Sequence, residues 1–133
     1  MIPVYQSIVD QGRGDCMRAV MALMFHLELE AVPHFILYEG HKWLDVFTHW
    51  LRAMDHEYIG CGYAEHIQET EPVNDCYYVA VPSRMFKDVW HAVLIDKSGV
   101  VIHDPNPNKA YLGENVVETG KIICLYRIEK IKA

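Results

Sequence analysis

One segment of the 133-residue chain limits its fold more than any other, because its residues are apolar on nearly every side of a helix. The segment runs from Cys16 to Leu27 and reads CMRAVMALMFHL, with Arg18 as its main charge. It follows a turn that contains two glycines and ends on Asp15, a residue type that favours the N-cap position. A helix without a polar face has to be buried, so we expect a central helix that begins at Cys16.

A second helix is expected from Lys42 to Met54, where apolar residues recur every three or four positions and form one face. After residue 57 the pattern changes to short runs rich in strand-favouring residues. The expected strands cover residues 57–63, 76–81, 89–95, 100–103 and 121–131. A turn at 96–99 would join the third strand to the fourth as a hairpin. Helices followed by an antiparallel sheet predict a single α+β domain over residues 1–133.

Composition and charge exclude several classes of protein. Hydrophobic residues make up 51% of the chain and charged residues 23%, which rules out a disordered chain. The net charge is −6 and no cluster of Lys and Arg offsets it, so nucleic acid is not an expected partner. The sequence contains no apolar stretch long enough to span a bilayer and no pattern of a secretory signal. We therefore expect no membrane partner and a cytoplasmic location.

The four cysteines form no Cys-x-x-Cys pair, which favours reduced thiols over a zinc or disulfide framework. Cys76 and Cys124 are interpreted as packing residues, and so is Cys61, for which the alternative is a second thiol near a site. Cys16 differs from them because it lies at the start of the central helix, where the partial positive charge of the helix N-terminus stabilises a thiolate. A cysteine in an apolar helix is more often a packing residue when it stands alone. A catalytic role for Cys16 therefore depends on partners elsewhere in the chain.

Two such partners lie on the expected hairpin. His91 begins one strand, and the register of the hairpin puts it near Asp104 on the next strand. Pro105 ends that strand directly after Asp104, which leaves the carboxylate at an edge of the sheet. A thiol, an imidazole and a carboxylate arranged in this way predict nucleophilic catalysis by Cys16, with His91 as the base and Asp104 holding its ring.

These residues also carry a resemblance to a known family. Gly14-Asp15-Cys16 at a helix start, His91-Ala92-Val93 on a strand and the later Asp104-Pro105 resemble the papain-like cysteine peptidases of the C39-like group. The chain is also similar to small uncharacterised phage and bacterial proteins that share the stretch Val32-Pro33-His34-Phe35. The resemblance implies a papain-like fold, in which N-terminal helices pack on a C-terminal antiparallel sheet. It implies a Cys16–His91–Asp104 triad and no cofactor.

The resemblance further implies a glutamine upstream of the nucleophile, whose amide helps to bind the developing oxyanion. Gln6 is preferred because it ends the kind of short segment in which the family usually shows its glutamine, whereas Gln11 is closer to the usual spacing. Asp15, Met17 and Trp90 would line the substrate cleft. The family usually has a glycine at the position of Met17, so the bulkier side chain is expected to narrow that cleft.

The function implied is that of a cysteine hydrolase or an acyl or peptidyl transferase, acting on a peptide, isopeptide or amide bond of a peptide or protein. The sequence leaves two alternative functions open. It does not indicate the oligomeric state. One alternative is a papain-fold binding protein without turnover, such as a phage-encoded inhibitor or adaptor that works in the host cytoplasm. The other is a metal-dependent hydrolase that uses His41, Asp45 and His49 on one helix face. That face is more simply interpreted as the solvated side of the helix, so no metal is predicted.

Overall fold

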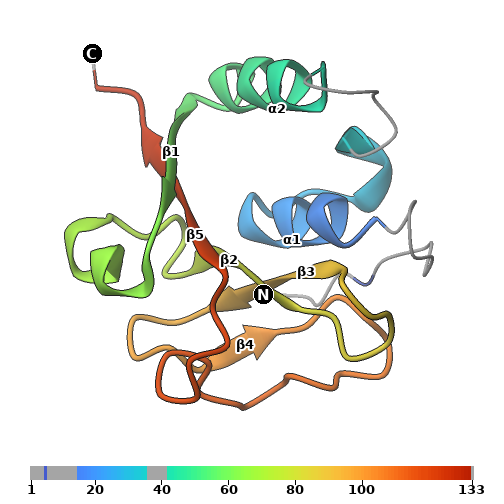
Figure 1. Ribbon diagram of the computed structural model, residues 1–133. Helices are drawn as coiled ribbons and strands as arrows, with labels where there is room; N and C mark the ends of the chain where they lie inside the picture. Colours follow the sequence, from blue (N-terminus) through green and yellow to red (C-terminus); the bar gives the residue numbers. More distant parts are fainter. Residues whose placement is uncertain (1–4, 6–14, 36–41, 133) are drawn as a thin grey trace.

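The computed structural model describes residue 5, residues 15–35 and residues 42–132 of the chain. These residues form a five-stranded antiparallel sheet with the two α-helices packed on one of its faces (Figure 1). The helices are α1 (Cys16–Met24), the short 3-10 helix η1 (Leu29–Ala31), α2 (Lys42–Ala53) and the 3-10 helix η3 (Ala64–Glu69). The strands are β1 (His56–Gly62), β2 (Tyr77–Pro82), β3 (Trp90–Ile95), β4 (Val101–His103) and β5 (Cys124–Lys130). The predicted α+β class is confirmed.

The buried central helix that the apolar segment predicts is α1. Seven of its nine residues are buried, Asp15 occupies the N-cap position, and the helix packs against β3. It ends at Met24, earlier than the apolar pattern suggests, because His26 takes a positive φ of 57° that a right-handed helix does not allow. Within the described part of the chain, no helix is long and apolar enough to cross a membrane.

The second predicted helix is confirmed as α2, which buries one apolar face. Phe47 and Leu51 are fully buried, whereas Asp45 and His49 lie on the exposed side. The ring of Phe35 packs edge-on against that of Phe47, with centroids 5.2 Å apart. These side chains belong to a core that fills the space between the two helices and one face of the sheet.

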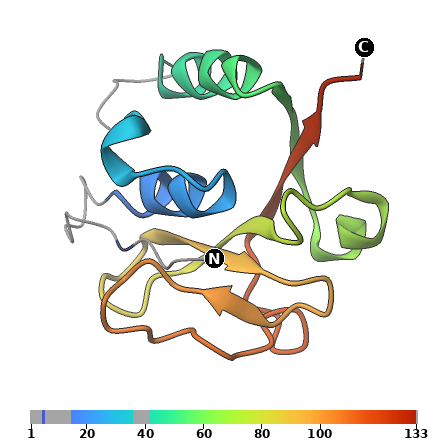
Figure 2. The same ribbon diagram turned by 180° about the vertical axis from the view of Figure 1, so that it is seen from behind.

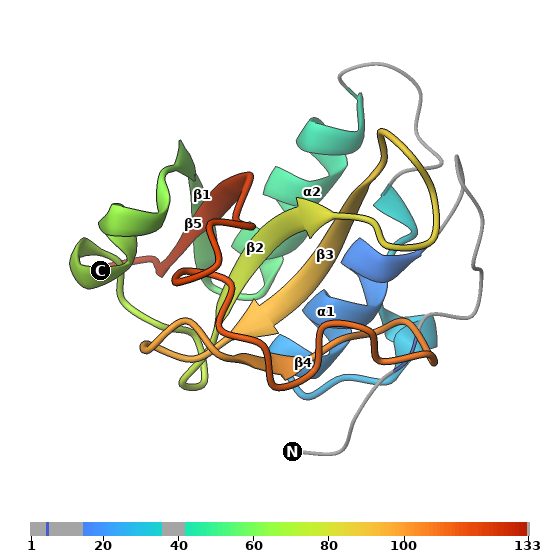
Figure 3. The same cartoon turned by 60° about the horizontal axis from the view of Figure 1, so that its bottom comes forward.

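The sheet has the strand order β1-β5-β2-β3-β4, and every neighbouring pair of strands is antiparallel (Figure 3). All five predicted strands are confirmed, with ends shifted by at most three residues. β5 follows every other strand in the chain, yet it lies between β1 and β2.

Both faces of the sheet are covered, which explains the apolar character of its central strands. The two α-helices cover one face, while η3 and the long segment 104–123 cover the other (Figure 2). Residues 77–81 of β2 and 92–95 of β3 are all buried. Strands that are buried on both sides appear in a sequence as continuous apolar runs rather than as an alternation.

The turn at 96–99 joins β3 to β4 as predicted and sets the hairpin that carries His91. Oδ1 of Asp96 accepts hydrogen bonds from the backbone N–H groups of Ser98, at 2.9 Å, and Val100, at 3.1 Å. Gly99 has a φ of +95°, and a Cβ atom at this position would lie 2.5 Å from Cγ2 of Val117. Only glycine fits there, so the turn is held in one geometry.

Candidate active site

His91 and Asp104 meet across the β3–β4 hairpin. His91 is the second residue of β3, and Asp104 directly follows β4. Nε2 of His91 lies 2.6 Å from Oδ1 of Asp104, which is a hydrogen-bond distance. Leu94 pairs with His103, and this register continued along the hairpin puts Asp104 opposite Val93. Asp104 therefore reaches His91 diagonally rather than straight across, because the hairpin contains an irregularity in register that the sequence did not indicate.

Asp104 is buried and accepts three hydrogen bonds. Besides the bond with His91, the backbone N–H of Asn106 donates to Oδ1 and that of Tyr111 donates to Oδ2, both at 3.0 Å. Burial raises the pKa of Asp104, but the hydrogen bond and charge of His91 and the two backbone N–H groups lower it by more, so the net direction is down. All three partners are donors. A carboxylate suits them, whereas a carboxamide would have to turn its NH₂ group toward one of them.

Cys16 completes the arrangement from the start of α1. The side chain is half-buried and lies near enough to His91 to raise the pKa of its imidazole. Because Asp104 holds Nε2, Nδ1 is the ring nitrogen left for Cys16. Burial lowers the pKa of His91, but the hydrogen bonds to Asp104 and Cys16 and the charges of both raise it by more, to about 9. At neutral pH the imidazole therefore holds a proton between a carboxylate and a sulfur.

Tyr111, in the segment that follows β4, contacts both members of the hairpin pair. Its ring lies close to parallel with the imidazole of His91, with centroids 6.5 Å apart and planes at 26°. Its backbone N–H donates to Asp104, and its hydroxyl donates to the carbonyl oxygen of Pro82 at the end of β2. The residue is 2% exposed. Tyr111 is thus held at both ends and limits the movement of His91.

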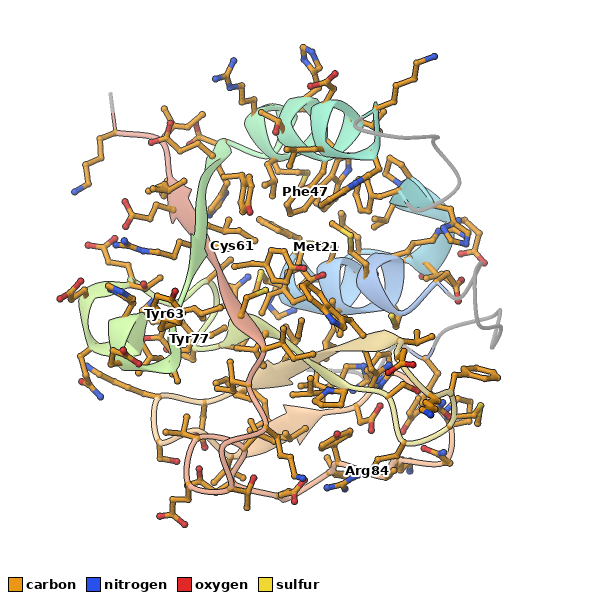
Figure 4. The ribbon with its side chains drawn as sticks, in the orientation of Figure 1. Met21, Phe47, Cys61, Tyr63, Tyr77 and Arg84 are labelled. Carbon is orange, nitrogen blue, oxygen red and sulfur yellow. The ribbon has the colours of Figure 1, made fainter. Side chains whose placement is uncertain are left out.

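Arg84, labelled in Figure 4, lies in the turn between β2 and β3 and contacts this tyrosine. Its guanidinium carbon lies 3.8 Å from the centroid of the Tyr111 ring, a cation–π contact. The guanidinium also donates to the carbonyl oxygen of Ala110, at 2.7 Å, and to the carboxylate of Glu114, at 2.6 Å. Neither Arg84 nor Tyr111 was predicted from the sequence, because contacts between distant segments leave no local pattern.

The loop after Asp104 is shaped by three successive Asx turns. Oδ1 of Asp104 accepts the N–H of Asn106, Oδ1 of Asn106 accepts the N–H of Asn108, and Oδ1 of Asn108 accepts the N–H of Ala110, each at 3.0 Å. Pro105 separates the first two acceptors, and a second proline separates the next two. Prolines have no N–H to satisfy, so they fit these positions. The run Asp-Pro-Asn-Pro-Asn was the signal in the sequence from which this rigid loop could have been predicted.

A shallow pocket that is open to solvent borders His91 and Asp104, and Cys16 is not among the residues that line it. Asn106, Asn108 and Arg84 also line it, so the pocket wall carries amide and guanidinium N–H groups. Such donors suit the carbonyl oxygens of a peptide. Trp90 is 58% exposed and is not among the residues that line this pocket, so its place in a substrate cleft stays a prediction.

Asp15 and Met17, the neighbours of Cys16 in the chain, are buried, which corrects the expectation that they line a substrate cleft. Asp15 is 0% exposed, and Met17 is 4% exposed and packs in the core. Successive residues of a helix point about 100° apart, so Met17 turns inward while Cys16 stays half-buried. Met17 therefore does not narrow a cleft at the surface.

Gln6 and Gln11, the two candidates for the oxyanion donor, lie outside the described residues. Tyr5 is described, and its ring lies 5.7 Å from that of His103, the residue before Asp104. The chain at Tyr5 thus lies against the hairpin that carries the site. The role of either glutamine stays a prediction.

The structure describes two of the three residues of the alternative metal site. Asp45 and His49 are exposed on α2, and His41 lies outside the described residues. Across residues 15–35 and 42–132, no group of three or more His, Cys, Asp or Glu side chains is arranged to hold a metal ion.

No family model matches the chain, and neither a characterised protein nor a solved structure matches it. A conclusion about function therefore has to come from the arrangement of Cys16, His91 and Asp104.

Proposed function

We propose that the chain is a cysteine hydrolase, or an acyl or peptidyl transferase, with a papain-like fold and a peptide, isopeptide or amide bond as its target. The observation that carries the proposal is the position of His91, whose Nε2 is hydrogen-bonded to Asp104 and whose pKa is also raised by the neighbouring Cys16. A thiol that can pass its proton to an oriented imidazole is the nucleophile of such reactions. The N-terminus of α1 adds a partial positive charge where the sulfur would carry a negative one.

In the proposed reaction, the proton of Cys16 resides on His91 before substrate binds, and the thiolate of this pair attacks the carbonyl carbon of the substrate. The backbone N–H of Cys16 is among those that a helix leaves without an intrahelical partner, so it can donate to the oxyanion. Gln6 or Gln11 would supply the second donor, as the resemblance implies. The C–N bond then breaks and His91 gives its proton to the leaving amine. Water, or an acceptor amine in a transferase, attacks the thioester, and its proton returns through His91 to Cys16.

The proposal is tested by the rate at which iodoacetamide alkylates each cysteine, followed by peptide mapping across acidic and neutral pH. An ordinary cysteine is only about 0.3% thiolate near pH 6. If Cys16 exists as a pair with protonated His91, we expect it to react at least about tenfold faster at that pH than an ordinary thiol such as free cysteine. Cys76 is buried and bonded to the carbonyl of Val73, so it should stay almost unreactive and reports whether the protein remains folded.

His91→Ala should abolish this advantage, whereas His49→Ala on the exposed side of α2 should leave it unchanged. A peptide or isopeptide probe with an electrophilic warhead should then label wild type and fail to label Cys16→Ala. If Cys16 of the folded wild type reacts no faster than an ordinary thiol, or if His91→Ala leaves its rate unchanged, the proposal is wrong. A binding protein without turnover then becomes the better hypothesis.

A further inference from the structure

Two thiols away from Cys16 lie on one face of the sheet, across β1 and β5. Cys61 pairs directly with Tyr126, and Gly62 pairs with Leu125. Cys124 stands two residues before Tyr126 on the same strand, so it shares the face of Tyr126 and is the diagonal neighbour of Cys61. Figure 4 shows Cys61 near β5, at a distance from Arg84 and the site around it.

The ring of Tyr126 lies on the same face as the two thiols. That ring stacks on the ring of Tyr78 of β2, with centroids 4.1 Å apart and planes at 14°. On the side of β1, its centroid is 6.3 Å from that of the Tyr58 ring. Burial is the main cause that raises the pKa of Cys124 to about 11, and both the charge of Cys61 and a side-chain hydrogen bond with Cys61 contribute. Cys61 is thus near enough to Cys124 to affect its pKa, in agreement with their diagonal register.

A bulge in β1 brings a hydroxyl group to the same sulfur. The register of β1 on β5 shifts between Tyr58 and Gly60, so Tyr58 and Cys61 share a face although they are three residues apart. The hydroxyl oxygen of Tyr58 lies 2.9 Å from Sγ of Cys61. Burial and the neighbouring Cys61 raise the pKa of Tyr58 above its usual range, so the phenol keeps its proton. It can donate that proton in a hydrogen bond to a thiolate at Cys61.

The two thiols differ in access to solvent. Cys61 is exposed, whereas Cys124 is 8% exposed. A small oxidant therefore reaches Cys61 first, and Cys124 is placed to react with whatever forms there. This division between an exposed attacking thiol and a buried second thiol is what a disulfide-forming site requires.

We propose that Cys61 and Cys124 form an oxidation site that takes a hydroperoxide and closes to a disulfide between β1 and β5. The Cys61 thiolate attacks one peroxide oxygen, the O–O bond breaks, and the departing oxygen leaves as water or alcohol after taking a proton, which leaves a sulfenic acid on Cys61. The sulfur of Cys124 then attacks that of Cys61. The S–O bond breaks, the disulfide forms, and the hydroxide leaves as water with the thiol proton of Cys124. Two thiols are oxidised and one peroxide is reduced.

The test treats the folded protein with hydrogen peroxide and maps its peptides without reduction. We expect a disulfide-linked pair of peptides, one with Cys61 and the other with Cys124. Dithiothreitol should separate the two peptides. The Cys124→Ser variant should instead accumulate a sulfenic acid on Cys61 that dimedone traps, at least about tenfold more than in wild type. Cys76→Ser is the matched control, since Cys76 is a buried thiol on a neighbouring strand end, and it should form the linked pair as wild type does.

Two results would overturn the proposal. One is wild-type protein in which Cys61 goes to a sulfinic acid or is trapped by dimedone while Cys124 stays a thiol. The other is a linked pair that forms only under denaturing conditions. If Cys124→Ser does not fold, the mapping of wild type and of Cys76→Ser still decides between these outcomes. The readout does not involve Cys16, so it is independent of the proposed hydrolase activity.

Discussion

Replacing Asp104 with Asn tests what keeps the proton on His91. The pKa of His91 rises from 6.5 to about 9, although burial alone would lower it. This rise corresponds to about 3 kcal/mol in favour of the imidazolium. A unit charge about 4 Å away contributes about 4 kcal/mol at an effective dielectric constant of about 20, so the carboxylate can offset burial and contribute to the rise together with Cys16. Asp104→Asn removes the charge and keeps the shape, and we expect the pKa of His91 to fall by about two units.

The measurement is an NMR titration of the His91 imidazole, with the resonance assigned by its loss in His91→Gln. Cys16→Ser is the matched comparison, because it removes the other charged partner and leaves the Nε2 bond in place. If wild-type His91 titrates at 6.5, or if Asp104→Asn leaves its pKa near 9, the electrostatic reasoning for this site is refuted.

The rise in the pKa of His91 also makes the stability of the fold depend on pH. The pKa of His91 is higher in the folded state than in the unfolded state, so the stabilisation is fully present below pH 6.5 and is lost as the pH rises through about 9. The free energy of unfolding of wild type should fall by up to about 3 kcal/mol across this interval. Urea denaturation at a series of pH values measures the slope, which Asp104→Asn should make much shallower.

Three further substitutions test the contacts that hold the site and the surrounding fold in place. Tyr111→Phe removes the bond to the carbonyl of Pro82 and keeps the ring beside His91. We expect a loss of about 1 kcal/mol in urea denaturation and an unchanged His91 pKa; a changed pKa would show that the hydroxyl also positions the imidazole. Gly99→Ala should lower the free energy of unfolding by at least about 2 kcal/mol, because φ is +95° and the added methyl group would meet Val117. A decrease of less than about 0.5 kcal/mol in thermal unfolding would contradict the assigned turn. Phe47→Ala leaves a cavity at a fully buried position, so it should lower the free energy of unfolding by about 3 to 5 kcal/mol in the same assay. A smaller decrease would mean that α2 is not packed as described.

The features that the sequence predicted are those that depend on local pattern. The apolar segment after Asp15 had to be a buried helix, because no face of it could meet solvent, and α1 confirms this. The meeting of His91 and Asp104 was predictable because the short turn at 96–99 leaves little choice in how the two strands align. The exact register was not predictable, since a single irregularity moves one strand past the other.

The features that the sequence did not reveal depend on contacts between distant segments. Arg84 and Tyr111 approach each other from separate loops, and nothing near either residue signals that contact. Cys61 was interpreted as a packing residue, but the bulge in β1 leaves it exposed and next to Tyr58. Met17 was expected at the surface because it adjoins Cys16 in the chain, yet one step along a helix was enough to turn it into the core.

The place of β5 between β1 and β2 bears on how the protein folds during synthesis. β2, β3 and β4 follow one another along the chain, so they can pair as soon as residues 77–103 have left the ribosome. β1 is made before them but has no strand partner until residues 124–130 appear. Until then, one half of the sheet exposes an unpaired edge together with the thiol of Cys61. The nascent chain thus depends on its final strand to close that edge, and a chain released before residue 124 keeps it open to other proteins.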